Sequence, residues 1–326
     1  MRVYVANFLQ IFLPLVLVLV FPRILDYCGI SRMNYRPRSS LTQVLINKGL
    51  KMNAETENGE LVKPGWYQVN LQDISDEKMR EKFVQLSADT ATQEFARQSS
   101  EKSDWIFTQL YQNFAKIFMS IFYTQTDING ILGRGSMFVL SREQYLTLTD
   151  GLEGEKMIDL GAGDGAPTMS MFHSFTSVYA TEASAPMRKI LKSNGIQVLE
   201  VEHWAEQGPF DLISCLNLLD RADNPETILQ AIKASLKPQG LLLIALVLPF
   251  RPYVELNVKE KNKPSQLLDI HGDTTEQQIV SAVEVLRRAG FDLVRWSRVP
   301  YLCEGDLNQP IYHLTDFILV LKHQDQ

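Results

Sequence analysis

From Gly151 onward, short apolar runs alternate with stretches in which apolar residues recur at helical spacing. This alternation predicts an α/β fold in which helices cover both faces of a largely parallel sheet of seven strands. The predicted strands are 156–160, 177–181, 197–200, 210–215, 240–248, 293–299 and 318–321, and the predicted helices are 167–174, 184–194, 224–236 and 275–289. The long apolar run at 241–248 is typical of a strand that is buried on both faces.

Residues 3–22 carry no charged side chain, and a run of about 20 residues is long enough to cross a bilayer as a helix. No small-residue cleavage site follows the run, so we favour an uncleaved anchor over a cleaved signal peptide. The arginines that follow the run are Arg23, Arg32, Arg36 and Arg38. They favour a cytosolic position for the rest of the chain. We expect segment 1–25 to target the endoplasmic reticulum or another intracellular membrane, the mitochondrion included.

The remaining chain divides into three predicted parts. Residues 26–74 are rich in polar residues and turn formers and are interpreted as a linker. Residues 75–130 have helical character, with Ser75 as a predicted N-cap before the acidic residues Asp76 and Glu77, and form a helical N-terminal extension. An apolar and aromatic stripe between 105 and 122 is expected to pack on the following domain, which covers 131–326.

Charge and cysteine content exclude several kinds of protein. The chain has 32 basic and 38 acidic residues, a net charge of -6, so we expect no nucleic-acid partner. Its 3 cysteines are too scattered for a disulfide framework and lack the spacing of a zinc site. The 5 histidines show no metal-ligand spacing either, so we predict no metal site.

The most informative motif is the glycine-rich run 159–165 (DLGAGDG), which lies where the first strand turns into a helix. Gly161 and Gly163 allow a ligand to approach the backbone, whereas Asp159 would repel a pyrophosphate and suit a cation. Glu182 ends the next strand, where a carboxylate accepts hydrogen bonds from ribose hydroxyls. A cationic ligand with a ribose and no phosphate indicates S-adenosylmethionine. An ordinary strand-to-helix turn, or an NAD-type site with a displaced glycine, is the alternative.

Asn217 and Asp220 follow the fourth strand, at the edge of the sheet where the methyl group would lie. We predict that both act in catalysis. The alternative for Asp220 is a cap on the helix that begins near residue 223.

Several strings resemble the DREV-type methyltransferases, a family of protein-histidine N-pros-methyltransferases. They are 132–138 (LGRGSMF), 159–165 (DLGAGDG), 180–182 (ATE), 214–221 (SCLNLLDR), 245–250 (ALVLPF), 252–255 (PYVE) and 300–306 (PYLCEGD). The resemblance implies the class I S-adenosylmethionine-dependent fold, which is Rossmann-like. It also implies transfer of a methyl group to the pros nitrogen of histidine in His-x-His stretches of protein substrates.

The resemblance further implies roles for single residues. Cofactor contacts fall to Asp159, Gly161, Gly163, Glu182, Asn217 and Tyr301. Asp220 and Tyr312 would face the target histidine, and Pro249, Phe250 and Tyr253 would help to form the peptide groove. Arg134 would either bind the cofactor carboxylate or form a salt bridge that packs the helical region on the sheet.

As a mechanism, we expect Asp220 to accept the N–H of the far imidazole nitrogen, so that the pros nitrogen keeps its lone pair. Two other functions stay open at this point. One is a membrane-associated methyltransferase for small molecules or lipids, and the other is a non-catalytic binding module that retains the cofactor fold.

Overall fold

The computed structural model describes residues 61–104, 119–120, 123–254, 262–305, 309 and 311–324. The predicted membrane segment, most of the predicted linker and residues 105–118 of the apolar stripe lie outside these ranges. Among the helices that the structure describes, none combines the length and the apolar character needed to cross a membrane.

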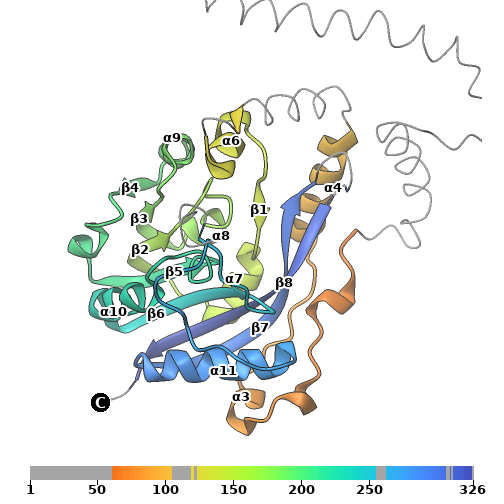
Figure 1. The fold of residues 1–326 in the computed structure, drawn as a ribbon, viewed down its shortest axis with the longest axis vertical. Helices are drawn as coiled ribbons and strands as arrows, with labels where there is room; N and C mark the ends of the chain where they lie inside the picture. The colour runs from red at the N-terminus through yellow and green to blue at the C-terminus, as the bar shows by residue number, and fades with distance from the viewer. Residues whose placement is uncertain are drawn as a thin grey trace, which may run out of the picture.

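One sheet of 8 strands forms the centre of the described chain, in the order β1-β7-β8-β6-β5-β2-β3-β4 (Figure 1). The strands are β1 (Met137–Phe138), β2 (Gly154–Leu160), β3 (Phe175–Thr181), β4 (Gln197–Leu199), β5 (Phe210–Leu216), β6 (Leu236–Val247), β7 (Phe291–Glu304) and β8 (Ile311–His323). Strands β2 to β6 pair in parallel, whereas β8 pairs antiparallel with β6 and β7. The chain reverses its direction of travel across the sheet between β2 and β5, so the ends of these strands form a switch point where ligands bind.

The predicted α/β class is confirmed, and all seven predicted strands are present. The eighth strand, β1, has two residues and pairs antiparallel with β7 through Met137 and Cys303. A strand of this length has no periodic pattern of its own, which is why the sequence predicts seven strands and not eight.

Helices cover both faces of the sheet. One apolar cluster includes residues of α3 (Glu77–Glu81), α10 (Pro225–Ser235) and α11 (Thr275–Arg288). The other includes residues of α4 (Thr90–Asp104), α7 (Arg142–Thr149), α8 (Met169–Phe172) and α9 (Ala185–Ser193). The short elements η1 (Pro64–Tyr67), η2 (Leu71–Asp73) and η3 (Trp204–Gln207) and helix α6 (Gln125–Leu132) complete the fold. Figure 1 shows α6 beside α9, and residues of the two helices are in contact.

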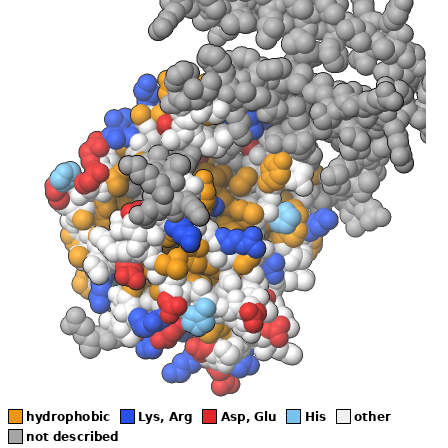
Figure 2. Space-filling view, viewed as in Figure 1, with side chains coloured by type: hydrophobic (Ala, Val, Ile, Leu, Met, Phe, Trp, Pro, Cys, Tyr) orange, Lys and Arg blue, Asp and Glu red, His pale blue; other side chains and the backbone are white. Residues whose placement is uncertain are grey.

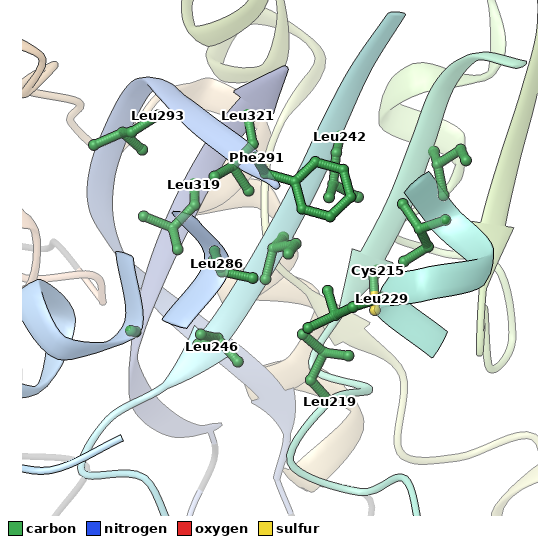
Figure 3. Packing of buried hydrophobic residues seen from close by; sticks show 14 of the residues in the cluster. Cys215, Leu219, Leu229, Leu242, Leu246, Leu286, Phe291, Leu293, Leu319 and Leu321 are labelled. Carbon is green, nitrogen blue, oxygen red and sulfur yellow. The ribbon is translucent and has the colours of Figure 1, made fainter. Parts of the chain in front are cut away.

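Strand β6 shows why the sheet needs both layers. Leu242 and Ile244 belong to one apolar cluster, Leu243 and Ala245 belong to the other, and all four are fully buried. Successive side chains of a strand point to opposite faces, so a continuous apolar run requires cover on both sides, as predicted. Figure 3 shows Leu242 and Leu246 packed with side chains of α10, α11 and β8. Truncating one such leucine to alanine costs about 2–5 kcal/mol.

The N-terminal part differs from the sequence prediction in two ways. The helical extension is interrupted, because Val84 donates to the Trp296 carbonyl (2.8 Å) and the Trp296 amide donates to the Lys82 carbonyl (3.1 Å). Residues 82–84 therefore lie along the edge of β7 instead of continuing a helix. Part of the predicted linker also packs in the core, since Tyr67 and Ile74 are buried.

Candidate functional site

The glycine loop after β2 is held open by its backbone conformation. Gly161 has φ 70° and Gly163 has φ 57°, in the left-handed region that favours glycine. A Cβ on Gly163 would meet only the Met137 Cε, at 3.8 Å, so a ligand can approach this part of the backbone. The Gly161 amide donates to the Thr181 Oγ1 at 3.2 Å, and the Ala162 amide donates to the Thr181 carbonyl at 3.0 Å. The end of β3 therefore fixes the loop.

Glu182 follows β3 and is 9% exposed. Its Oε2 accepts from the Gly163 amide (2.9 Å), and its Oε1 accepts from the Ser184 amide (2.8 Å). A carboxylate offers about four lone-pair positions, so two acceptor positions remain for other donors. The Ser184 hydroxyl also donates to Asp127 Oδ1 of α6 (2.7 Å). The predicted ribose-binding carboxylate is thus fixed next to the loop that it was predicted to serve.

Asp159 is buried at the end of β2, and protein donors occupy both of its oxygens. The Thr168 hydroxyl donates to Oδ2 (2.5 Å) and the Ser214 hydroxyl donates to Oδ1 (2.7 Å). Burial raises the pKa of Asp159 to about 6, the two hydroxyls oppose this rise, and the charge of Glu182 adds to it. Asp159 therefore supports the loop by linking β2 to β5 and to the turn before α8. A direct contact with a ligand was the sequence prediction.

Asn217 directly follows β5, with φ 54°, and its amide donates to the Ala245 carbonyl of β6 (3.1 Å). Its Nδ2 donates to Asp316 Oδ2 at 2.8 Å. Its Oδ1 is buried and has no hydrogen-bond partner among the described residues. The side chain thus presents an unused acceptor at the carboxyl end of a central strand.

Asp220 lies in the turn that follows β5 and is 3% exposed. Its Oδ2 is 3.2 Å from the Arg221 Nε, while its Oδ1 is buried without a partner in the described part of the chain. Burial raises the pKa of the Asp220 carboxyl, and Arg221 opposes the rise. The capping alternative is excluded, because Asn224 is the N-cap residue of α10.

Sequence reasoning missed Asp316, which is fully buried on β8. In addition to the bond from Asn217, its Oδ1 accepts from the Phe317 amide at 3.0 Å. Burial raises its pKa to about 7, Asn217 lowers it, and the charge of Asp220 raises it further. A signal was present in the sequence, because Asp316 shares strand parity with the buried Ile318 and Val320.

Tyr301 of β7 reaches the same part of the molecule. Its hydroxyl donates to the Met137 sulfur, and Met137 lies beside Gly163. Burial raises the pKa of Tyr301, and the negative charges of Asp316 and Asp220 contribute to this. Tyr301 therefore lies near both the glycine loop and the buried carboxylates, and its cofactor contact stays a prediction. Tyr312 of β8 lies opposite Cys303 and is 37% exposed.

The segment after β6 is fixed to Asp220. The Tyr253 amide donates to the Asp220 carbonyl (2.8 Å), and the Arg221 guanidinium lies 6.0 Å from the Tyr253 ring centroid. Tyr253 is 46% exposed, Pro249 is exposed, and Phe250 packs partly on the core. Figure 2 shows hydrophobic side chains gathered near the centre of one face, with Lys and Arg side chains beside them. The predicted groove residues Pro249, Phe250 and Tyr253 thus immediately follow β6, and Tyr253 lies close to Asp220.

Arg134 precedes β1, and its buried Nη1 has no hydrogen-bond partner among the described residues. The loop is attached to β7 by Glu304 instead, whose Oε2 accepts from the Gly135 amide (2.9 Å) and the Ser136 amide (3.2 Å). Glu304 also pairs with Lys102. Among the described residues, Glu304 therefore makes the contacts that attach this loop to β7 and α4, and Arg134 Nη1 remains an unused donor.

These residues fit S-adenosylmethionine. Glu182 has acceptor capacity for the ribose, Asn217 Oδ1 is an unused acceptor for the positively charged end, and Arg134 Nη1 is an unused donor for the carboxylate. Both unused atoms are buried, and buried polar atoms are normally paired.

Comparison with known proteins agrees with this fit. The family model described as DREV methyltransferase matches residues 66–323. A ubiquinone biosynthesis O-methyltransferase of Glaesserella parasuis is 32% identical over 113 residues, which cover 30% of this chain and 48% of that protein. The enzyme of the same name from Shewanella pealeana is 23% identical over 185 residues, which cover 48% of this chain and 78% of that protein. The chain spans about half the length of most of these curated relatives.

Among solved structures, a putative type 11 methyltransferase from Sulfolobus solfataricus has a TM-score of 0.35 at 17% identity, covering 56% of this chain and 92% of that one. A TehB-like methyltransferase from Corynebacterium glutamicum has a TM-score of 0.37 at 17% identity, covering 57% of this chain and 89% of that one. The assignment rests on the strand order and the family match. The chain belongs to the DREV methyltransferase family, whose class I fold uses S-adenosylmethionine as its cofactor.

Proposed function

We propose that this methyltransferase modifies the pros nitrogen of histidine in His-x-His stretches of protein substrates. The observation that carries the proposal is the Asp220 carboxylate, which is buried and has an oxygen without a partner among the described residues. An imidazole N–H is a donor of matching size and polarity. Supporting features are Tyr253 and Arg221 beside Asp220 and the membership of the DREV family.

In this reaction the main task of the protein is to align the cofactor and the histidine. When bound, S-adenosylmethionine supplies a sulfonium methyl group, an electrophile that requires no further activation. A neutral imidazole is a competent nucleophile near pH 7, and only one of its ring nitrogens carries the lone pair in a given tautomer. In the proposed complex, Asp220 Oδ1 accepts the N–H of the far nitrogen, which selects the tautomer with the lone pair on the pros nitrogen.

Asp220 has a second role in this proposal. Methylation leaves a positive charge on the ring, and a carboxylate in a buried site stabilises that charge more strongly than water does. Asp220 can then accept the proton of the far nitrogen, so that the product leaves as neutral methylhistidine. Burial raises the pKa of Asp220, which makes its carboxylate a better proton acceptor than that of an exposed aspartate.

The remaining residues bind and orient. Asn217 and Tyr301 contact the cofactor in this proposal, and Tyr312 stands with Asp220 at the target histidine. Tyr253 offers an exposed ring next to Arg221, as a wall for the peptide. The membrane attachment predicted for residues 3–22 and the intracellular membrane location remain predictions.

A second candidate comes from the names of the curated relatives. They are called ubiquinone biosynthesis O-methyltransferases, and most of the matches cover about 30% of this chain. A buried carboxylate beside the cofactor would also serve as a base for a hydroxyl substrate. A membrane-associated methyltransferase for small molecules or lipids is therefore the alternative.

The test is to incubate the full chain with labelled S-adenosylmethionine and either a peptide containing His-Ala-His or a total lipid extract. Mass spectrometry should find one methyl group on the peptide, on the pros nitrogen of a histidine, and a peptide with Gln in place of both histidines should stay unmodified. Label in the lipid fraction alone would replace this proposal by the second candidate. No transfer to either substrate, with cofactor binding seen by calorimetry, would favour the non-catalytic module.

A further inference from the structure

Asp316 is a carboxylate that the proposed reaction does not use directly. It lies on β8, opposite Val247 of β6 and Val299 of β7, and it is fully buried. The titratable groups whose charges interact with that of Asp316 are Asp220, Tyr301 and Cys303. No cationic side chain pairs with it among the ion pairs of the described residues.

Both oxygens of Asp316 act as acceptors. Oδ1 accepts from the Phe317 amide and Oδ2 accepts from Asn217 Nδ2. Above its raised pKa of about 7, Asp316 is ionised and acceptor-only, and in that form it can face only the nitrogen end of an asparagine amide. The Asn217 backbone is itself fixed in the left-handed region, with its amide bonded to Ala245. Asp316 therefore decides which end of the Asn217 side chain points away from β8, and that end is the oxygen.

The direction of this amide matters for methyl transfer. An oxygen at the carboxyl end of β5 attracts the cationic end of the cofactor and leaves the nucleophile's lone pair unbonded. An N–H in the same place would donate to that lone pair and would repel the cation.

We propose, on the basis of the function proposed above, that Asp316 is a positioning residue that holds the Asn217 amide with its oxygen toward the methyl-transfer site. It acts through Asn217 and does not contact substrate itself. A change at Asp316 should therefore alter cofactor binding and turnover only as far as it alters the Asn217 amide.

The first test is Asp316→Asn, which keeps the size of the side chain. Its remaining oxygen stays with the Phe317 amide, and the new NH2 group takes the place of Oδ2. That group requires an acceptor, so the Asn217 amide turns over and directs its own NH2 group to the site. We expect the affinity for S-adenosylmethionine, measured by calorimetry, to fall about tenfold, the typical effect of one hydrogen bond to a charged group. The kcat for the His-Ala-His peptide should fall at least as much.

The decisive variant exchanges the two side chains, as N217D together with D316N. The carboxylate at position 217 then accepts from the amide at position 316, and its second oxygen faces the site as the Asn217 oxygen does in the natural chain. Aspartate tolerates the left-handed backbone at this position. Cofactor affinity and kcat should return to within about threefold of the natural protein, since the same number of hydrogen bonds is restored. A merely structural role for Asp316 predicts no such recovery.

A double-mutant cycle provides the second measurement. With N217A as background, adding D316N should cost no further cofactor affinity, because the amide through which Asp316 acts is gone. The proposal is wrong if D316N binds cofactor as the natural protein does. It is also wrong if the exchanged pair is folded by its melting temperature yet binds no better than D316N. Cofactor titration needs no peptide, so failure of the histidine assay in every protein would overturn the proposed function and leave this result intact.

Discussion

The two halves of the site differ in whether their buried side-chain oxygens have hydrogen-bond partners. At β2 and β3, each carboxylate oxygen of Asp159 and Glu182 accepts a hydrogen bond from a hydroxyl or a backbone amide. In the turn after β5, Asn217 Oδ1 and Asp220 Oδ1 are buried and lack partners among the described residues. In the first half every carboxylate oxygen already has a protein donor, and Glu182 keeps two further acceptor positions for a ligand. In the second half, two acceptors have no partner among the described residues until a ligand binds.

This difference has an energetic meaning. Leaving a buried acceptor unpaired costs about 1–3 kcal/mol, and more when the group is charged. Folded proteins keep such costs mainly where function requires them. The paired half therefore fixes the glycine loop and Glu182 in place before the cofactor binds, and the unpaired half gains partners for its free acceptors only when ligands bind.

The largest test of this contrast is Asp220→Asn. The amide keeps the shape of the side chain but can turn its NH2 group toward the imidazole, and it cannot accept the proton. We expect kcat for the His-Ala-His peptide to fall at least about 100-fold, the lower end of the usual contribution of a general acid or base. Cofactor affinity, measured by calorimetry, should stay within about threefold, because Asp220 faces the substrate in this proposal.

The matched control is Glu284→Gln, which removes the charge of an exposed carboxylate that pairs with Arg287 on α11. It should leave both kcat and affinity unchanged. Turnover of D220N near the natural rate would mean that the unpaired oxygen has no part in catalysis.

The sequence predicts those parts of the site whose residues are close together along the chain, and it misses contacts between residues that are far apart along the chain. The glycine loop, Glu182 and the turn after β5 follow from local patterns, and the structure brings them to one edge of the sheet. Asp316 lies 99 residues from Asn217, and only the pairing of β8 with β6 joins them. The Glu304 contact with the Gly135 amide spans 169 residues. Pairing across such separations is decided by tertiary packing, which a single sequence does not display.

The next test addresses the paired half through Glu182→Ala. This variant removes the acceptors of the Gly163 and Ser184 amides together with the predicted ribose contact. Affinity for S-adenosylmethionine should fall about 10- to 100-fold, which corresponds to a loss of about 1–3 kcal/mol. Calorimetry measures it, and saturating cofactor should restore most of the peptide turnover. A loss of kcat at saturation instead would place Glu182 in the chemical step.

A smaller effect is expected from Arg134→Ala, which removes the unused buried donor near β1. If Arg134 binds the cofactor carboxylate, affinity for S-adenosylmethionine should fall about tenfold, as expected for one charged hydrogen bond. Affinity for methylthioadenosine, which lacks the amino-acid part, should not change. Equal losses for the two ligands would show that Arg134 acts on the loop structure and not on the carboxylate.

The smallest expected effect is on the pH dependence of folding stability. It involves Asp159 and Asp316, two buried carboxylates with raised pKa values. Burial raises the pKa of Asp159 to about 6 and that of Asp316 to about 7, against an ordinary value near 4. Each group then holds its proton more tightly in the folded chain than in the unfolded chain. Their destabilising contribution is absent below about pH 4, grows as the pH rises, and is complete above the folded-state pKa.

Melting temperatures at pH 5 and pH 8 test this directly. Because of these two groups, the melting temperature of the natural protein should be lower at pH 8 than at pH 5. Replacing either carboxylate should make this difference smaller by a few degrees. The effect should be larger for D316N than for D159N, because more of the Asp316 transition falls between pH 5 and pH 8. E284Q is again the control, since pairing with Arg287 lowers the pKa of Glu284 and keeps it ionised throughout. Equal slopes in D316N and the natural protein would mean that Asp316 is already ionised at pH 5. In that case its charge is stabilised by more than the bonds from Asn217 and Phe317.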